Sequence, residues 1–359
     1  MARIDLDLAH SYQRVVRSDA DYALLPLKIT FDDGGAYALL GPSGCGKTTM
    51  LNIISGLVTA SHGAVRFDGA DCTRATPQQR NIAQVFQFPV IYDTMTVGEN
   101  LAFPLRNRKV PAAQVRERVG RIAEMLDLSS VLDQRAANLA ADAKQKISLG
   151  RGLVRPDVSA VLFDEPLTVI DPHLKWELRR KLKQIHHELG LTLIYVTHDQ
   201  VEAMTFADQV LVMARGRVVQ QGTPAELFER PRHTFVGHFI GSPGMNLLPV
   251  ERRADRSLWL ADQALAGADA LSLPDGPLTL GIRPEYLRVL PDAAAGTVPA
   301  TVQRVRHVGT SQLISARVGG QELKAHIAPD AAAPESGAQV HLALLDPHTC
   351  FYQNEELIA

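Results

Sequence analysis

The sequence lacks three features that mark large classes of proteins. Its three cysteines, Cys45, Cys72 and Cys350, are widely spaced and make no metal-binding pattern. No apolar run approaches the ~18 residues that a membrane-spanning helix needs, and the first ten residues do not resemble a signal peptide. Lys and Arg total 37 against 39 Asp and Glu, so composition gives no argument for nucleic-acid partners. These absences predict a protein of the reducing cytoplasm whose membrane role, if any, comes through a partner.

The order of apolar patterns predicts an α/β domain in the first part of the chain. Residues 1–235 alternate strand-like and helix-like stretches, which indicates a mainly parallel, buried sheet. Short apolar runs predict central strands at residues 36–40, 158–163 and 191–197. Apolar residues at helical spacing predict helices within 115–126 and 174–189.

Beyond residue 241 the pattern changes. Proline and glycine become frequent, and the helical spacing of apolar residues fades. Short strand-like runs follow at residues 298–307, 313–318 and 339–345. We therefore predict a separate small β domain over residues 236–359.

The most informative motif follows the first predicted central strand. It reads Gly41-Pro42-Ser43-Gly44-Cys45-Gly46-Lys47-Thr48 and fits the phosphate-binding loop G-x-x-x-x-G-K-[ST]. Glycines let the backbone wrap closely around a triphosphate, and the helix predicted over 48–57 adds its positive N-terminal end. We expect Lys47 to reach the β and γ phosphates and the Thr48 hydroxyl to bind Mg²⁺, with Thr49 completing the nucleotide contacts.

Two acidic residues and a histidine follow later predicted strands. Asp164 and Glu165 end the apolar run that begins at residue 158. A carboxylate at that place is suited to hold Mg²⁺ through water, which predicts a role for Asp164. Glu165 is placed to polarise the attacking water as general base. A neutral imidazole at His198 is suited to hydrogen-bond the γ phosphate and the same water.

Two further candidates lie outside these motifs. Gln87 comes about forty residues after the lysine of the loop, and we interpret it as a sensor whose amide reaches Mg²⁺ or the attacking water when the cleft closes. Tyr12 lies about thirty residues before the loop, and two readings of it stay open. Its ring either stacks on adenine or is an ordinary packed or exposed aromatic.

This series of residues resembles the ATP-binding subunit of ABC transporters, in order and spacing, across residues 1–235. Three segments are more specific and resemble the ATPases of bacterial sugar and polyol importers of the maltose and glycerol-3-phosphate type. They are Val-Thr-His-Asp-Gln-Val-Glu-Ala-Met at 196–204, Phe-Ile-Gly-Ser-Pro-Gly-Met-Asn at 239–246 and Gly-Ile-Arg-Pro-Glu at 281–285. The resemblance covers nearly the whole chain.

The resemblance implies a P-loop NTPase (RecA-like) core with an α-helical subdomain at about 88–150, followed by an all-β OB-like regulatory domain. It implies ATP and Mg²⁺ as cofactors and a peripheral position on the cytoplasmic face of the bacterial inner membrane. The implied partners are two integral-membrane permease subunits and, indirectly, a periplasmic solute-binding protein. In that family the ATPases pair head to tail, so that each ATP lies between the phosphate loop of one subunit and the signature motif of the other.

The sequence departs from the family in the signature motif, which normally reads Leu-Ser-Gly-Gly-Gln. The aligned residues are Leu139-Ala140-Ala141-Asp142-Ala143, while the flanks at 144–146 and 150–156 still match. Ala140 removes a hydroxyl, and Ala141 adds a methyl group where the backbone must approach a phosphate. Asp142 adds a negative charge, whose repulsion of a phosphate charge at ~5 Å is at most about 3 kcal/mol. The alternative is that Asp142 caps the helix and faces away from the nucleotide.

The D-loop, which helps to join the two ATP sites of the family's dimer, departs as well. The usual Ser-Asn-Leu-Asp reads Thr168-Val169-Ile170-Asp171, so an amide is lost at Val169 while Asp171 is kept. The chain thus keeps what its own phosphate loop needs and lacks what it would donate to its partner's nucleotide. We therefore hypothesise a heterodimer with a second ATPase that carries an intact signature.

Three alternatives remain at the level of sequence. The chain is a homodimeric sugar-importer ATPase with an unusual signature, or a structural or regulatory subunit that binds ATP with little turnover of its own. It is otherwise a soluble ABC ATPase of DNA repair or translation, which the neutral charge and the absence of long heptads disfavour. The solute cannot be read from this subunit, and glycerol or a related polyol is the working expectation.

Overall fold

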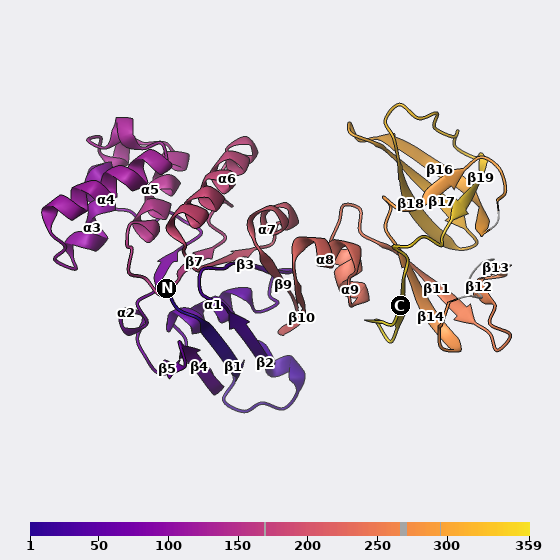
Figure 1. The fold of residues 1–359 in the computed structure, drawn as a ribbon, viewed down its shortest axis with the longest axis horizontal. Helices are drawn as coiled ribbons and strands as arrows, with labels where there is room; N and C mark the ends of the chain where they lie inside the picture. The colour runs from indigo at the N-terminus through magenta and orange to yellow at the C-terminus, as the bar shows by residue number, and fades with distance from the viewer. Residues whose placement is uncertain (169, 266–270, 295) are drawn as a thin grey trace. The chain divides into compact units, whose positions relative to one another are not determined.

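The computed structural model of the protein describes residues 1–168, 170–265, 271–294 and 296–359 (Figure 1). The chain divides into two compact units, Met1–Pro224 and Ala225–Ala359, each with its own hydrophobic core. The sequence suggests a boundary near residue 235, whereas the contacts place it earlier, at the start of α8 (Pro224–Glu229). Helix α9 (Thr234–Phe239) then follows within the second unit.

The first unit is built on a sheet whose strand order in the described residues is β10-β9-β3-β8-β7-β6. These strands are β3 (Ala36–Leu40), β6 (Ala83–Val85), β7 (Val161–Asp164), β8 (Leu193–Thr197), β9 (Gln209–Ala214) and β10 (Arg217–Gly222). Only the β9–β10 pair is antiparallel among them. β3 and β8 are buried along their whole length, as expected for central strands of a sheet covered on both faces. The predicted parallel α/β sheet is therefore confirmed.

A second, antiparallel sheet lies in the same unit, with strand order β2-β1-β4-β5. Its strands are β1 (Ile4–His10), β2 (Leu24–Phe31), β4 (His62–Phe67) and β5 (Ala70–Asp71). One hydrophobic core joins both sheets to α1 (Lys47–Ser55), which buries Met50, Leu51 and Ile53 in it. The short helix α2 (Pro77–Arg80) follows this sheet along the chain. The sequence analysis did not anticipate this sheet.

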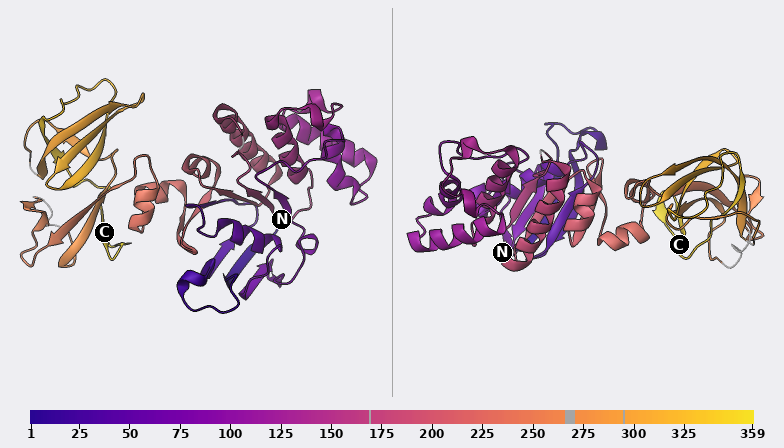
Figure 2. Two further views of the ribbon diagram at one scale, coloured as in Figure 1. Left: turned by 180° about the vertical axis from the view of Figure 1, so that it is seen from behind. Right: turned by 90° about the horizontal axis from the view of Figure 1, so that it is seen from above.

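Helices make up most of the segment between β6 and β7. They are α3 (Val97–Arg106), α4 (Ala112–Met125) and α5 (Ala141–Leu153), and Figures 1 and 2 show them grouped apart from the two sheets. Each amphipathic helix turns its apolar side toward the other two, which contact one another. After β7 come α6 (Pro172–Leu189) and α7 (Gln200–Phe206), the latter between β8 and β9.

The second unit is all-β apart from its first two helices. Its antiparallel sheets have the strand orders β13-β12-β11-β14-β20-β21 and β15-β19-β16-β17-β18 in the described residues. The first comprises β11 (Asn246–Arg252), β12 (Leu258–Leu260), β13 (Gln263–Ala264), β14 (Gly276–Ile282), β20 (Cys350–Gln353) and β21 (Glu356–Leu357). The second comprises β15 (Arg288–Leu290), β16 (Thr297–His307), β17 (Gln312–Val318), β18 (Gln321–Ile327) and β19 (Gln339–Ala343). A common core lies between them, which confirms the predicted β domain.

Arg283 holds the helices of the second unit to its sheets. The side chain is 1% exposed, and its guanidinium donates hydrogen bonds to the carbonyls of Phe228, Leu227 (3.3 Å) and Ile240 (2.5 Å). It also stacks over the Phe228 ring, 4.0 Å from the ring centroid. Arg283 thus donates hydrogen bonds to three carbonyls at the ends of α8 and α9. Because this arginine belongs to the β domain, both helices are held to this unit.

Replacing this arginine is expected to destabilise the second unit selectively. Arg283→Met keeps the length of the side chain but leaves three buried carbonyls without a donor, at a cost on the order of 3 kcal/mol. Calorimetry of the full chain should show the unfolding transition of this unit shifted down by several degrees. Arg306→Met, at an exposed arginine of the same unit, is the matched control, and an equal shift in both variants would contradict the role of Arg283.

Candidate nucleotide-binding and catalytic site

The strand order of the parallel sheet brings the sequence-predicted motifs to one edge. β8 lies between β3 and β7, and all three are parallel. Their carboxyl ends therefore meet, and the segments that follow them are the phosphate loop, the Asp164-Glu165 pair and His198. In open α/β sheets, ligands bind outside the carboxyl ends of the strands.

The phosphate loop turns tightly between β3 and α1. Gly44 and Gly46 adopt φ of 78° and 104°, in the left-handed region that glycine allows without strain. A side chain at Gly41 would place its Cβ 2.3 Å from the backbone oxygen of Met213, and one at Gly46 would meet the oxygen of Ala23 at 2.6 Å. The glycines are therefore required by the packing of the loop itself, before any ligand is considered.

The polar residues at the start of α1 hydrogen-bond to the phosphate loop itself and to the end of β7. The Lys47 ammonium, in a side chain that is almost fully buried, donates to the carbonyls of Gly41 (2.8 Å) and Pro42 (3.0 Å). The Thr48 hydroxyl donates to the Asp164 carboxylate at 3.3 Å. Burial raises the pKa of the Asp164 carboxyl, and the nearby Glu165 carboxylate raises it further, against the opposing effect of the Thr48 hydrogen bond. An adjacent cation would relieve this buried charge.

Glu165 and His198 form a contact across the β7–β8 pair. The imidazole Nδ1 of His198 lies 3.1 Å from the Glu165 carboxylate, which also accepts a hydrogen bond of 3.4 Å from the Thr168 hydroxyl. Glu165 has φ of 47°, a conformation that costs a non-glycine residue about 1–3 kcal/mol and occurs most often at functional sites. Its backbone N–H is fixed to the carbonyl of Val196 at 3.0 Å. No sequence pattern predicts this strained conformation.

Glu202, a buried carboxylate that the sequence analysis missed, holds the end of β8 that precedes His198. Glu202 on α7 is 3% exposed and accepts hydrogen bonds from the hydroxyls of Tyr195 (3.0 Å) and Thr197 (2.8 Å). The Lys175 ammonium lies 3.7 Å from it. Burial, followed by the Glu202 charge, raises the pKa of Tyr195, so this hydroxyl stays a donor. The network fixes the end of β8 directly before His198.

Tyr12 and Gln87 lie in different surroundings. Tyr12 follows β1, is 66% exposed, and its hydroxyl lies 3.3 Å from that of Thr49 on α1. The ring also packs edge-on against His10, with centroids 4.5 Å apart. Gln87 is half-buried and, within the described residues, makes no hydrogen bond to Thr48 or Asp164. The structure thus places Tyr12 beside the loop helix, and Gln87 follows the carboxyl end of β6, at the same edge of the sheet as Asp164.

The altered signature forms the start of α5. Ala140 is the N-cap residue, with extended φ and ψ, and no side chain caps the helix. The alternative that Asp142 caps the helix is therefore wrong, because this residue sits inside the first turn. Asp142 instead lines a cavity of about 10 Å³ against α6, with Lys146 and Lys181 also in its lining. The side chain of Leu139 is half-buried, and Ala141 is exposed.

Gln145, one turn after the signature, is a second residue that sequence reasoning missed. Its side chain is fully buried, and its amide donates a 2.6 Å hydrogen bond to the carbonyl of Pro166. Pro166 directly follows Glu165, so this bond links the signature helix to the turn that carries the catalytic candidate. Of the D-loop, Val169 lies outside the described residues. Asp171 is the N-cap of α6 and accepts from the backbone N–H of His173 at 3.0 Å.

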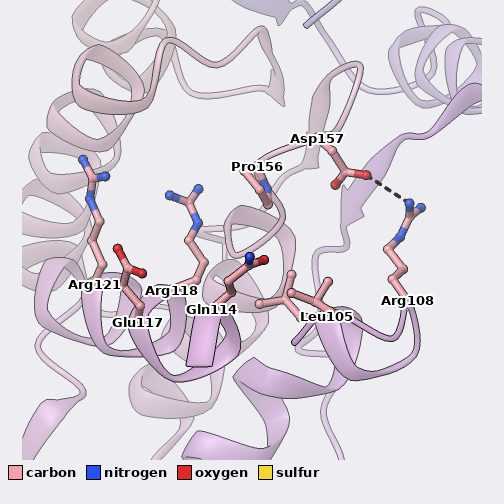
Figure 3. Close-up of a pocket in the computed structure, with 9 residues that line it drawn as sticks. Leu105, Arg108, Gln114, Glu117, Arg118, Arg121, Pro156 and Asp157 are labelled. Atoms are coloured by element: carbon pink, nitrogen blue, oxygen red, sulfur yellow. Dashed lines mark hydrogen bonds and ion pairs between the residues drawn. The ribbon is translucent and has the colours of Figure 1, made fainter. Parts of the chain in front are cut away.

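A cavity of about 500 Å³ opens away from these residues, in the helical segment. Figure 3 shows it lined by α3, α4 and the loop after α5, with the Arg108–Asp157 ion pair (3.1 Å) at one side. Arg118 and Arg121 project from α4 beside Glu117. None of the sequence-predicted site residues lines it. Among the described residues no helix is long and apolar enough to cross a bilayer.

The fold and this edge define a P-loop ATPase. The model of the ABC transporter family matches residues 24–168, and the TOBE domain model matches residues 280–351. A solved structure of cbiO1 from Clostridium perfringens, part of the ABC transporter complex cbiONQ, superposes with a TM-score of 0.57 at 27% identity. The superposed region covers 64% of this chain and 90% of the cbiO1 chain.

Relatives with an assigned function align with most of the chain. The sn-glycerol-3-phosphate import ATP-binding protein UgpC of Vibrio vulnificus (strain CMCP6) is 39% identical over 83% of this chain and 80% of its own length. The protein of the same name from Salmonella choleraesuis (strain SC-B67) is 38% identical over 92% and 93%. The chain belongs to the ATP-binding subunits of ABC importers, and it is an ATPase coupled to solute import.

Proposed function

We propose that this chain binds and hydrolyses Mg²⁺·ATP as one of two different ATPase subunits of a bacterial importer for glycerol phosphate or a related polyol. The observation that carries the proposal is an asymmetry within the described residues. Two pairs of groups around its own phosphate loop, Thr48–Asp164 and Glu165–His198, are in contact, whereas the helix start that would serve a partner's nucleotide offers no hydroxyl. The solute class is inferred from the relatives, which are sn-glycerol-3-phosphate import ATP-binding proteins.

The residues at the loop suit magnesium. The Thr48 hydroxyl and the Asp164 carboxylate are hard oxygen donors 3.3 Å apart, and the burial of Asp164 favours a neighbouring cation. In the part of the chain that the structure describes, no group of three or more His, Cys, Asp or Glu side chains is arranged to hold a metal ion by itself. Mg²⁺ would therefore take its other ligands from phosphate oxygens and water, as it commonly does. When bound, the ion would neutralise charge on the transferring phosphoryl group.

Hydrolysis is assigned to Glu165 and His198, which follow the carboxyl ends of β7 and β8. Glu165 carries an ionisable carboxylate that three groups hold in place: Thr168, His198 and its own strained backbone. It is positioned to accept a proton from an attacking water as general base. His198 is 55% exposed at its side chain, so its second nitrogen is free to approach a γ phosphate. Tyr12 is proposed to stack on the adenine ring beside Thr49.

The second ATPase is proposed because of the first turn of α5. A signature acts by aiming a hydroxyl and unhindered N–H groups at a phosphate, and Ala140 and Ala141 provide neither. Asp142 adds a negative charge to the same first turn, although its side chain lines the cavity against α6. A site formed by this phosphate loop and an intact partner signature would be competent. The reciprocal site would bind ATP and turn it over slowly.

The helical segment is proposed to face two permease subunits, with the chain docked peripherally at the cytoplasmic face of the inner membrane. A periplasmic solute-binding protein would deliver the solute to them. The cavity between α3 and α4 supports this placement, because it joins apolar Leu105 to exposed charges and lies apart from the nucleotide site. A cavity that combines apolar and charged side chains is suited to bind a segment of another protein.

The composition of the native complex tests the heterodimer. Native mass spectrometry of the transporter, purified through a tag on this chain, is expected to show one copy of it, one second ATPase with an intact signature, and two permeases. Transport of radiolabelled sn-glycerol-3-phosphate, glycerol and maltose by the same complex then assigns the solute. A fully active complex with two copies of this chain would show a homodimeric importer instead. Single-turnover hydrolysis near zero would favour a structural subunit.

A further inference from the structure

One face of the second sheet in the β-rich unit carries an unusual concentration of positive charge. The inward face of β16, β17 and β18 packs in the core through residues such as Val302, Ile314 and Leu323. Side chains alternate between the faces of a strand, so the residues next to Ile314 and Leu323 point outward. On β16 a register shift between Val302 and Arg304 changes the alternation, so that Arg304 pairs with the outward Ser315. We call Arg304, Arg306, Arg317 and Lys324 the basic face, and the first three of them are exposed while Lys324 is half-buried.

The strand register brings the four cations together. Arg304 on β16 pairs with Ser315 on β17, which pairs with Lys324 on β18. Arg306 lies two residues after Arg304, on the same face of β16. Arg317 lies two residues after Ser315 on β17, beyond the opposite end of this row, and pairs with Glu322 on β18. With strands ~4.8 Å apart and ~6.8 Å between outward residues of one strand, the basic face measures roughly 10 by 14 Å.

These cations are not neutralised locally. None of the four takes part in an ion pair within 4.0 Å among the described residues, and Glu322 makes none with Arg317 despite their direct register. Other basic groups near the sheet are His341 on β19, His326 on β18 and Arg288 on β15. Two acidic residues, Glu335 and Asp330, lie in loops that hydrogen-bond to Val302 and Gln312 at the edge of the basic face. The His326 ring is held by the Ser311 hydroxyl at 2.8 Å.

The rest of the unit has the opposite charge. Residues 225–359 contain 11 Lys and Arg against 15 Asp and Glu. The basic face holds four of the former, and Glu322 is the acidic residue in register with it, so the remainder carries 7 basic and 14 acidic residues. Such a focused field steers and orients a partner of opposite charge.

The size and chemistry of the basic face select among anionic partners. The outward positions of β16, β17 and β18 carry no aromatic residue, whereas sheets that bind single-stranded nucleic acid use aromatic rings to stack bases. A nucleic-acid duplex or a lipid surface would extend beyond 14 Å and meet the acidic remainder of the unit. A short acidic segment of a protein matches both the extent and the sign of the charge.

We propose that the basic face docks an acidic segment of another protein, rich in Asp and Glu, as an interaction surface separate from the ATP site. A fluorescein-labelled peptide of ten alternating Glu and Asp residues serves as the probe, and its anisotropy is followed against the full-length chain. The expected result is saturable binding that weakens steeply as salt is raised. Arg304→Glu/Arg306→Glu should weaken binding at least tenfold, and Arg304→Lys/Arg306→Lys should retain most of it.

The matched control is Arg230→Glu/Arg256→Glu, which makes the same change in net charge at exposed arginines elsewhere in the unit. It should change the affinity less than twofold, and ATP hydrolysis and thermal unfolding should be unaltered in both double variants. Equal losses in the two variants, or no binding by the unaltered chain, would overturn the proposal. Tighter binding of duplex DNA or of phosphatidylserine vesicles, lost in Arg304→Glu/Arg306→Glu, would likewise overturn it in favour of that surface.

Discussion

Restoring the signature motif is expected to raise steady-state ATP hydrolysis by the purified chain at least tenfold. The variant combines Ala140→Ser, Ala141→Gly, Asp142→Gly and Ala143→Gln. Its serine would stand at the N-cap of α5, where the present residue offers no side-chain hydrogen bond, and its glycines would clear the first turn. Loss of one preorganised donor to a transition state commonly costs 10²–10³ in rate, so regaining a hydroxyl and the backbone approach should have a large effect.

The measurement is phosphate release at a protein concentration high enough to pair the chains, since the restored motif acts on the nucleotide of another copy. Ala140→Ser alone should give a partial gain, because the Asp142 carboxylate would remain. Ala112→Ser/Ala113→Gly, at the exposed start of α4, is a matched control that changes another helix N-terminus. A restored variant that pairs yet hydrolyses ATP at the original rate would show that the signature does not limit turnover.

The surroundings of α5 suggest that this exchange is tolerated. Ala140 and Ala141 are exposed, so their replacement leaves the hydrophobic core untouched. Asp142 faces Lys146 and Lys181, but both lysines already have the Asp127 carboxylate as partner. The helix is anchored independently by Gln145, whose amide bonds to the carbonyl of Pro166. We therefore expect the variant to fold and the change in rate to report on the site.

The part of the site that sequence could predict is the part encoded by contiguous motifs. The strand, loop and helix around Gly41 to Thr48 are recognisable because glycine spacing, a lysine and flanking periodicity coincide within a short segment. The meeting of Glu165 with His198 depends on β7 lying next to β8, which strand patterns alone do not give. The positive φ of Glu165 is likewise set by the packed turn and not by the residue type.

The elements that sequence reasoning missed share a different cause. The antiparallel sheet escaped notice because β2 contains a proline and a lysine at its exposed positions, which weakens the apolar signal. Glu202 and Gln145 are polar residues buried among hydrogen-bond donors and carbonyls, and nothing in their sequence surroundings separates them from ordinary surface residues. The boundary before α8 follows from Arg283, more than fifty residues away along the chain.

Glu165→Gln is expected to lower ATP hydrolysis about 100-fold or more while leaving ATP affinity nearly unchanged. The amide keeps the shape of the carboxyl group and an oxygen that accepts from His198 and Thr168, so the local geometry should persist. It cannot accept a proton from water, and general-base catalysis typically contributes 10²–10⁴ in rate. Glu177→Gln, an exposed carboxylate on α6, is the control and should hydrolyse ATP normally.

The same substitution also separates the two sites of the assembled importer. If this chain's phosphate loop pairs with an intact partner signature, Glu165→Gln removes the competent site and transport should fall nearly to zero. The corresponding glutamate of the second ATPase serves the site that faces Ala140 and Asp142, and its replacement should reduce transport far less. Equal losses from the two substitutions would show that both sites turn over. The altered signature would then be a tolerated variation and not the cause of an asymmetric pair.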